Sequence, residues 1–454
     1  MKLTERWYWF VYRCAKGRDI SGELARLLRE QYLPLPELQA LQMERLRAVL
    51  AHAAAHVPYY RNLFQRIGFA PGDLRSIESL SALPPLERPT IRDRVDDLIA
   101  DDVARDRLHM TTTSGSTGMP LATYHDPLAV TITAARYWRA NLAWGHRPCD
   151  RVLRIVRRPD TADWRTAFRD WLQRVLVNDR RWYVETVDRS DLARLVEVIR
   201  RWQPRTLRGF HDKLTLIASY LEQQGERLHV PRIVSGAALL TAEDRARFLE
   251  FLGHEVFDHY SAEEASGMAF ECEAHEGIHV AGESFVIEAI TDGRPAKPGE
   301  LGEVFVTTLT NFAMPLIRYR IGDTLTPVGS PCSCGRTLPL VRMTHGRVLD
   351  ILSAPDGRAV SPSAVIRVFR LFSESQVAQY QVVQETISRV RIRIVPKPGY
   401  SAAIEVSLAK AFGDVVGGHV QLEFEYPDSI PFDPRSKTRP IESKVPLRFD
   451  RPAT

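Results

Sequence analysis

Short apolar runs alternate with helical stretches between residues 110 and 340, and this alternation constrains the fold more than any other feature of the chain. Residues 152–156 and 232–234 form apolar runs of strand length, whereas residues 192–201 and 213–223 are helical stretches. Strands that alternate with helices build a sheet that is covered by helices. The sequence therefore predicts an α/β domain.

The regions on either side of this alternation differ from it. The chain up to about residue 105 is mostly helical in pattern, as at 38–57, and strands dominate from 283 to 327. After residue 347 a compact α+β pattern of about a hundred residues follows. Its elements are a strand with a turn at Asp356-Gly357, a helix from about 361, strands at 377–383 and 388–395, a helix at 402–412 and a strand at 421–426. We predict a large N-terminal domain of β-sheets flanked by helices at residues 1–346 and a small α+β C-terminal domain at residues 347–454.

Composition narrows the class of protein. The 454 residues exceed a single hydrophobic core, and the 44% hydrophobic and 26% charged residues are typical of a soluble globular protein. The formal charge of +5 is mild and the basic residues are scattered among acids, so no nucleic-acid patch is indicated. Five cysteines, an odd number, argue against a disulfide framework and favour a reducing cytoplasm.

The N-terminus carries an aromatic run at residues 6–12, Arg-Trp-Tyr-Trp-Phe-Val-Tyr. This run is too short and too aromatic for a transmembrane helix or a secretory segment. It predicts a docking helix, with contact to a membrane surface as the alternative.

Residues 111–120 read Thr-Thr-Thr-Ser-Gly-Ser-Thr-Gly-Met-Pro. Gly115 and Gly118 let the backbone bend so that its N–H groups converge on an anion. Further donors are the hydroxyl groups of Thr113, Ser114, Ser116 and Thr117. A Walker A loop would end in Gly-Lys-Ser/Thr, but Gly118 is followed by Met119, which disfavours a GTPase or kinase-type loop. The stretch is either a phosphate grip whose cation comes from elsewhere or a Ser/Thr/Gly linker.

Two later clusters place acidic residues beyond strand-like runs. In residues 259–267, Glu263 and Glu264 suit a hydrated Mg²⁺ ion held against nucleotide phosphates, and a charged surface turn is the alternative. In residues 315–323, Asp323 follows a strand and a glycine, as suits an acid that grips ribose hydroxyls.

Two more clusters complete a collinear set of five. Residues 345–350 read His-Gly-Arg-Val-Leu-Asp at the predicted domain junction, and residues 429–439 read Ser-Ile-Pro-Phe-Asp-Pro-Arg-Ser-Lys-Thr-Arg. In their order and spacing the five clusters resemble the adenylate-forming enzymes, and within them the phenylacetate-coenzyme A ligase and capsule-biosynthesis adenylating branch. The resemblance covers nearly the whole chain, and residues 46–61 and 298–304 are also similar to that branch.

The resemblance implies a nucleotide site. Residues 114–118 would hold the β and γ phosphates of ATP, and Tyr260 would stack near the adenine. Asp323 would bind the ribose, and Arg347 at the junction would also meet it. The C-terminal domain of such an enzyme is a mobile lid.

The resemblance also implies a reaction. Glu264 matches the glutamate tied to Mg²⁺ and is preferred to Glu263 by register, and Lys437 falls on the C-terminal catalytic lysine. A substrate carboxylate would attack the α phosphate, giving an acyl adenylate and pyrophosphate, and the acyl group would pass to a thiol such as coenzyme A. A carrier protein, a cofactor or a sugar precursor could replace that thiol, and a homodimer is left open.

Three positions depart from the family pattern. Ser261 stands in place of a glycine, Leu349 in place of the first aspartate of the junction motif, and Ser436 in place of the glycine before the lysine. A specialised active site, or a non-catalytic nucleotide-binding protein, would be consistent with these changes.

Three cysteines and a histidine form a separate constellation. Cys332 and Cys334 are one residue apart, where a disulfide between them would be badly strained, and Cys272 precedes His275 and His279. Three thiols and an imidazole suit a tetrahedral structural zinc ion, with His279 preferred because it follows a glycine at the start of the next strand. Unligated buried thiols are the alternative.

The pocket for the small carboxylic acid is expected at two strand ends, residues 207–211 and 235–239. Ser235, Gly236 and Ala237 are assigned to this combined nucleotide and carboxylate site. His211 would orient a carboxylate or serve as an ordinary core or surface histidine.

Overall fold

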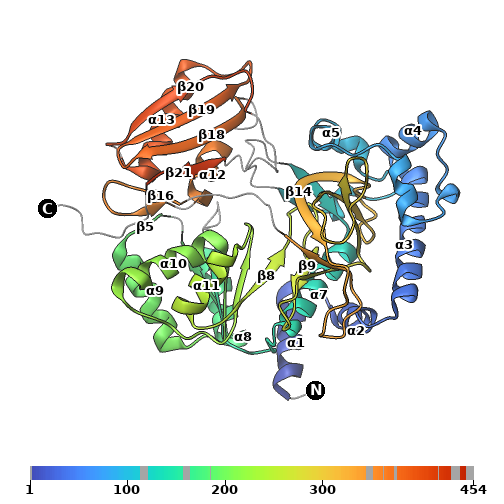
Figure 1. Cartoon of the computed structure of the whole chain (residues 1–454), viewed down its shortest axis with the longest axis horizontal. Helices are drawn as coiled ribbons and strands as arrows, with labels where there is room; N and C mark the ends of the chain where they lie inside the picture. Colours follow the sequence, from blue (N-terminus) through green and yellow to red (C-terminus); the bar gives the residue numbers. More distant parts are fainter. Residues whose placement is uncertain are drawn as a thin grey trace.

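The computed structural model describes residues 3–112, 121–156, 164–184, 186–343, 351–360, 362–372, 376–417, 419–430 and 440–445. Its largest sheet has twelve strands in the order β12-β11-β13-β14-β15-β10-β9-β8-β7-β6-β3-β4. Strands β8, β9 and β14 of this sheet are labelled in Figure 1. One end of this sheet is parallel and the other is antiparallel. The predicted α/β class is confirmed.

The parallel end carries the alternation seen in the sequence. Its strands are β3 (Val152–Val156), β4 (Asp179–Tyr183), β6 (Thr206–Phe210), β7 (Ile233–Gly236) and β8 (Val256–Tyr260). The intervening helices are α8 (Trp164–Val177), α9 (Arg189–Trp202), α10 (His211–Gln224) and α11 (Ala242–Leu252). The apolar faces of α9, α10 and α11 bury one core against the strands, whereas α7 (Pro127–Ala143) lies along the other face.

Local signals fix the ends of these helices. Asp188 caps α9 by accepting a hydrogen bond of 2.8 Å from the backbone N–H of Asp191, and Thr241 caps α11 in the same way. Gly225 follows the last residue of α10 and Gly253 that of α11, both in the left-handed conformation that glycine tolerates.

The antiparallel end is a set of short strands and hairpins. Its strands are β9 (Ala269–Glu271), β10 (Ile278–Val280), β11 (Phe285–Thr291), β12 (Arg294–Pro295), β13 (Gly302–Thr308), β14 (Tyr319–Pro327) and β15 (Leu340–Arg342). A separate two-stranded antiparallel sheet pairs β1 (His109–Thr112) with β2 (Ala122–His125). This part of the sheet shares one hydrophobic core with the N-terminal helices.

The N-terminal region is helical, as its pattern predicted. The helices are α1 (Leu3–Lys16), α2 (Ser21–Glu30), α3 (Leu35–His56), α4 (Pro58–Ile67), α5 (Arg88–Asp93) and α6 (Val95–Leu98), with 3₁₀ turns at Pro71–Asp73, Ile77–Ala82 and Arg105–Arg107. Helix α1 docks on α7, because the rings of Tyr8 and Trp9 lie 5.1 and 4.9 Å from that of Trp138. None of the described helices combines the length and apolar character needed to cross a bilayer.

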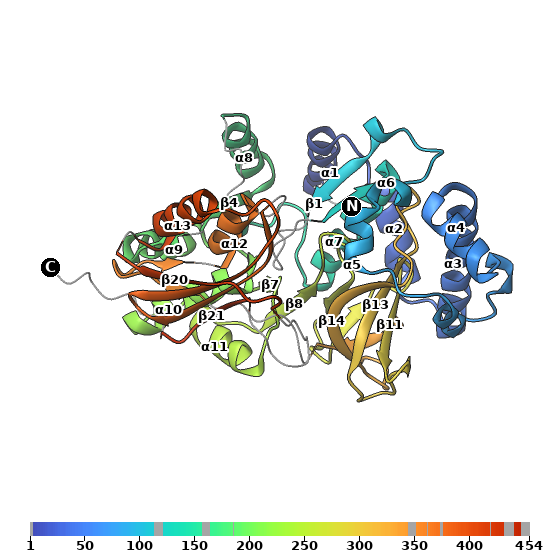
Figure 2. The same ribbon diagram turned by 90° about the horizontal axis from the view of Figure 1, so that it is seen from above.

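The C-terminal part forms its own sheet, seen from above in Figure 2, and it has its own hydrophobic core. The sheet has the order β20-β19-β18-β21 and is covered by two helices. These elements are α12 (Pro362–Arg370), β18 (Val377–Thr386), β19 (Arg389–Pro396), α13 (Ala402–Val416), β20 (Gln421–Glu425) and β21 (Ile441–Ser443). A small sheet of β16 (Leu352–Ser353), β17 (Ala359–Val360) and β5 (Thr186–Val187) joins this part to the N-terminal region. The predicted domain junction at 346/347 lies outside the described residues.

Candidate functional site

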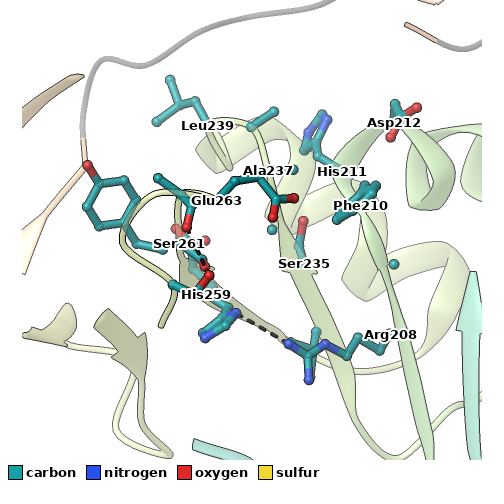
Figure 3. Close-up of a pocket in the computed structure, with 18 of the residues that line it drawn as sticks. Arg208, Phe210, His211, Asp212, Ser235, Ala237, Leu239, His259, Ser261 and Glu263 are labelled. Atoms are coloured by element: carbon teal, nitrogen blue, oxygen red, sulfur yellow. Dashed lines mark hydrogen bonds between the residues drawn. The ribbon is translucent and has the colours of Figure 1, made fainter. Parts of the chain in front are cut away.

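A cavity of about 640 Å³ opens at the carboxyl ends of β3, β6, β7 and β8 (Figure 3). Ligands of open α/β sheets bind at this edge because the loops that leave parallel strands diverge there. Residues from β14 and from α12 of the C-terminal part complete the wall. The two strand ends predicted to line the carboxylate pocket, 207–211 and 235–239, both contribute to the cavity except for Leu207, which is buried in the core.

The predicted adenine and ribose residues meet in this cavity. The Tyr260 hydroxyl donates a hydrogen bond of 2.9 Å to Asp323 Oδ2. Tyr260 is the last residue of β8, and Asp323 lies on β14 after Gly322, whose φ is +83°. A phenol and a carboxylate held together at the cavity wall can present an aromatic surface and a hydrogen-bond acceptor to one ligand.

Glu264 lies beside this pair with a carboxylate that is only partly engaged. Its Oε1 accepts hydrogen bonds of 2.9 Å from both Arg88 and the hydroxyl of Tyr319. Glu264 is buried yet lines the cavity, and within the described residues its Oε2 accepts no hydrogen bond. Oε2 is therefore the oxygen that remains available to a cation.

The turn after β7 brings backbone close to the cavity. Gly236 lies against β8, since a Cβ at this position would be 3.1 Å from the carbonyl oxygen of His259. Ala237 has a φ of +74°, a conformation that a non-glycine residue adopts only at an energetic cost. Ser235 is buried, and its Oγ has no hydrogen-bond partner among the described residues. That hydroxyl is a candidate contact for a ligand.

Ser261, the residue that replaces the family's glycine, uses its hydroxyl group to contact both helix α7 and the loop after β8. Its Oγ lies 3.1 Å from the hydroxyl of Tyr137 and accepts a hydrogen bond of 2.9 Å from the backbone N–H of Gly267. Ser261 therefore ties the loop after β8 to helix α7.

The face of the sheet that packs against helix α7 contributes Arg208 to the same cavity. Arg208 on β6 lies 3.4 Å from His259 Nδ1, and its guanidinium is 5.2 Å from the ring of Tyr137 and 5.5 Å from that of Trp144. Burial lowers the pKa of Arg208 to about 10, so the guanidinium keeps its charge at neutral pH. Burial also lowers the pKa of His259 well below its usual value, and the ring is therefore neutral.

His211 lies at the cavity, but it has its own acidic partner. Its Nε2 is 3.0 Å from Asp244 Oδ2. Burial alone would raise the pKa of Asp244, but the contact with His211 outweighs it and the pKa falls to about 2. The histidine that the sequence placed near the carboxylate is thus oriented by helix α11.

The predicted zinc ligands converge on one point. The ligand atoms of Cys272, His279, Cys332 and Cys334 all lie within 4.8 Å of one another. Cys272 Sγ and Cys332 Sγ are 3.6 Å apart, and Cys334 Sγ is 3.3 Å from His279 Nε2. Tetrahedral zinc with Zn–S bonds of about 2.3 Å separates its sulfur ligands by about 3.7 Å, so the donor set fits this ion.

The two candidate histidines have different surroundings. His279 Nδ1 is 3.4 Å from the carbonyl oxygen of Leu338, which leaves Nε2 facing the thiols. His275 instead contacts Glu271 and Glu255, at 3.2 and 3.3 Å.

Several predicted positions lie outside the described residues. These are the phosphate-loop candidates Thr113, Ser114, Gly115, Ser116, Thr117 and Gly118, together with Arg347 and Lys437.

Sequence reasoning missed several partners of the predicted site residues. Arg88 binds Glu264, and Tyr137 borders the cavity from helix α7. Tyr319 belongs to the cluster at 315–323, but its hydrogen bond to Glu264 was not predicted. Each lies more than 50 positions from its partner in the chain. No local pattern marks such residues, and only an alignment of relatives could have signalled them.

Comparisons with known proteins agree with this architecture. A family model described as the CapK C-terminal domain matches residues 352–444. Phenylacetate-coenzyme A ligase of Thermus thermophilus is 28% identical over 363 residues, which cover 77% of this chain and 79% of that protein. Phenylacetate-coenzyme A ligase of Escherichia coli is 30% identical over 301 residues, which cover 63% of this chain and 66% of that protein.

Solved structures share the fold. The 2-hydroxyisobutyryl-CoA ligase in complex with 2-HIB-AMP and CoA, in its thioesterification state, superposes with a TM-score of 0.62 at 20% identity and covers 92% of each chain.

Proposed function

This chain belongs to the family of the phenylacetate-coenzyme A ligases and CapK, and from that premise we propose that it activates a carboxylic acid with ATP. The acid's carboxylate attacks the α phosphate, an acyl adenylate forms and pyrophosphate leaves. The acyl group then passes to a thiol, for which coenzyme A is the candidate acceptor.

The observation that carries this proposal is the hydrogen bond between Tyr260 and Asp323 in the cavity. An adenosine whose ribose hydroxyls donate to Asp323 would lie beside the ring of Tyr260. The Ser235 hydroxyl, buried without a partner among the described residues, is a further contact for the bound adenylate or acid.

Glu264 is proposed as the ligand of Mg²⁺. Its Oε2 is available, while Arg88 and Tyr319 hold the carboxylate through Oε1. Mg²⁺, when bound, would neutralise charge on the triphosphate. The remaining assignments rest on family motifs: residues 114–118 for the β and γ phosphates, Arg347 for the ribose and Lys437 for the α-phosphoryl oxygens.

The cluster of three cysteines and His279 is proposed as a structural zinc site. All four positions are filled by side chains, so no open position is left for catalysis. Zinc here would hold β10 to the loops at Cys272 and at Cys332.

Carboxylate-dependent exchange of labelled pyrophosphate into ATP tests the adenylation step. We expect exchange with at least one acid of a panel, and AMP release when coenzyme A is added.

Tyr260→Phe should raise the KM for ATP by roughly tenfold, since it removes one hydrogen bond to the ribose-binding acid.

Tyr380→Phe is the matched control, because the hydroxyl of Tyr380 is buried in the C-terminal core without a partner among the described residues. This variant should leave the KM unchanged. ATP binding without exchange for any acid would contradict the proposed activity.

A further inference from the structure

We propose that the acid activated by this chain carries a second anionic group and that Arg208 binds this group. The inference rests on the proposed function, since it names the substrate class of the same cavity. It comes from the charges and hydrogen bonds around one guanidinium.

Arg208 places one positive charge at the wall of the cavity. Its neighbour Arg154, at the adjacent position on β3, also lines the cavity but is paired with Asp179 at 2.9 Å. Within the described part of the chain, no carboxylate lies within ion-pair distance of Arg208. Burying a cation in this way is costly unless a ligand supplies the opposite charge.

The guanidinium of Arg208 also offers more donors than its described neighbours use. It carries five N–H groups, and among the described residues its hydrogen-bond contact is with His259 Nδ1 at 3.4 Å. The rings of Tyr137 and Trp144 lie against it and hold it in place. Such a fixed, charged fork suits the two oxygens of a carboxylate or the oxygens of a sulfonate.

The Arg208 end of the cavity is separate from the nucleotide end. His259 and Tyr260 are consecutive on β8, so their side chains point to opposite faces of the sheet. His259 contacts Arg208, whereas Tyr260 binds Asp323. A substrate carboxylate that reacts beside the nucleotide therefore leaves Arg208 for a different group of the same acid.

Matched pairs of acids test this inference on the full chain. 3-Carboxyphenylacetate and phenylacetate differ by one carboxylate, as do glutarate and butyrate. We expect pyrophosphate exchange to favour the doubly charged acid of a pair by roughly a hundredfold in kcat/KM. Arg208→Met should abolish that preference, and Arg208→Lys should restore part of it.

Arg205→Met is the control, since this exposed arginine precedes the same strand and lies outside the cavity. It should keep the wild-type preference. Equal or better exchange with the singly charged acids, unchanged by Arg208→Met, would overturn the inference and leave the proposed function standing.

Calorimetry distinguishes failure of the Arg208 inference from failure of the proposed adenylation activity. Binding of 3-carboxyphenylacetate that is lost in Arg208→Met, without exchange for any acid, would support the Arg208 site and reject the activity. Absence of both binding and exchange would overturn both.

Discussion

At the scale of single residues, Asp258 is a carboxylate of the cavity wall whose pKa is strongly raised. It is buried on β8, and its backbone N–H donates a hydrogen bond of 2.7 Å to Glu271 Oε2. Burial and the nearby charge of Glu271 raise the pKa of Asp258 from 3.8 to about 7. The folded protein therefore holds a proton on Asp258 at pH values where the unfolded chain has lost it.

Asp258 makes the stability of the protein depend on pH. Between about pH 4 and pH 7 the folded state binds more protons than the unfolded state, so the free energy of unfolding falls as pH rises. Asp258→Asn removes the ionisable carboxyl group. The free energy of unfolding of this variant should exceed that of wild type by about 1 to 2 kcal/mol at pH 8, and by less at pH 5. Urea unfolding of both proteins at pH 5 and pH 8 measures the difference.

Asp244→Asn is the control of opposite sign. The pKa of Asp244 is lowered to about 2, so its ionised form stabilises the fold at both pH values and its loss should destabilise the protein. If the increase in the free energy of unfolding caused by Asp258→Asn were the same at pH 5 and pH 8, the raised pKa of Asp258 would be contradicted.

At the scale of secondary-structure elements, the antiparallel end of the large sheet contains three very short strands. β9, β10 and β15 have three residues each, and the cysteine–histidine cluster lies where β10 meets the loops at Cys272 and Cys332. Strands this short contribute few backbone hydrogen bonds of their own. A zinc ion bound by the cluster would add stability where these strands meet the two loops.

Metal analysis of purified protein should find about one zinc per chain. Cys332→Ser should lose the metal and unfold at a lower temperature, because a structural ion contributes directly to folding. Cys14→Ser is the control, since Cys14 is exposed on α1 and outside the cluster. Wild-type protein without zinc would reject the site.

At the scale of the whole molecule, both parts of the chain surround the cavity. Most of the wall comes from β6, β7, β8 and their loops, and Pro362 and Ile366 add to it from helix α12 of the C-terminal part. The C-terminal part has its own core, and we propose that it covers the site. Lys437 belongs to the same part of the chain.

Lys437→Ala should lower adenylation by on the order of 10²-fold or more, because a cation near the α-phosphoryl oxygens is worth most as their charge grows. Thioester formation from a supplied acyl adenylate should be spared. Lys444→Ala is the control, because Lys444 is exposed and its side chain is paired with Glu385. Equal loss in both half-reactions would contradict the assignment.

The sequence by itself determined the class of fold and the order of its elements. Periodicity is a local property, so the predicted helix at 402–412 appears as α13 (Ala402–Val416) and the predicted strand at 377–383 as β18 (Val377–Thr386). The motifs at Tyr260 and Asp323 also predicted a shared site, and their side chains meet although 63 positions separate them.

Only the tertiary structure decided which side chains surround those motif residues. Arg88 reaches Glu264 across 176 positions, and Arg208 lies against Tyr137 and Trp144 because β6 runs beneath helix α7. Such contacts depend on how distant segments pack, and a single sequence carries no periodic signal for them. The balance of charge in the cavity, which bears on the acid that can enter it, therefore became visible only when the chain was folded.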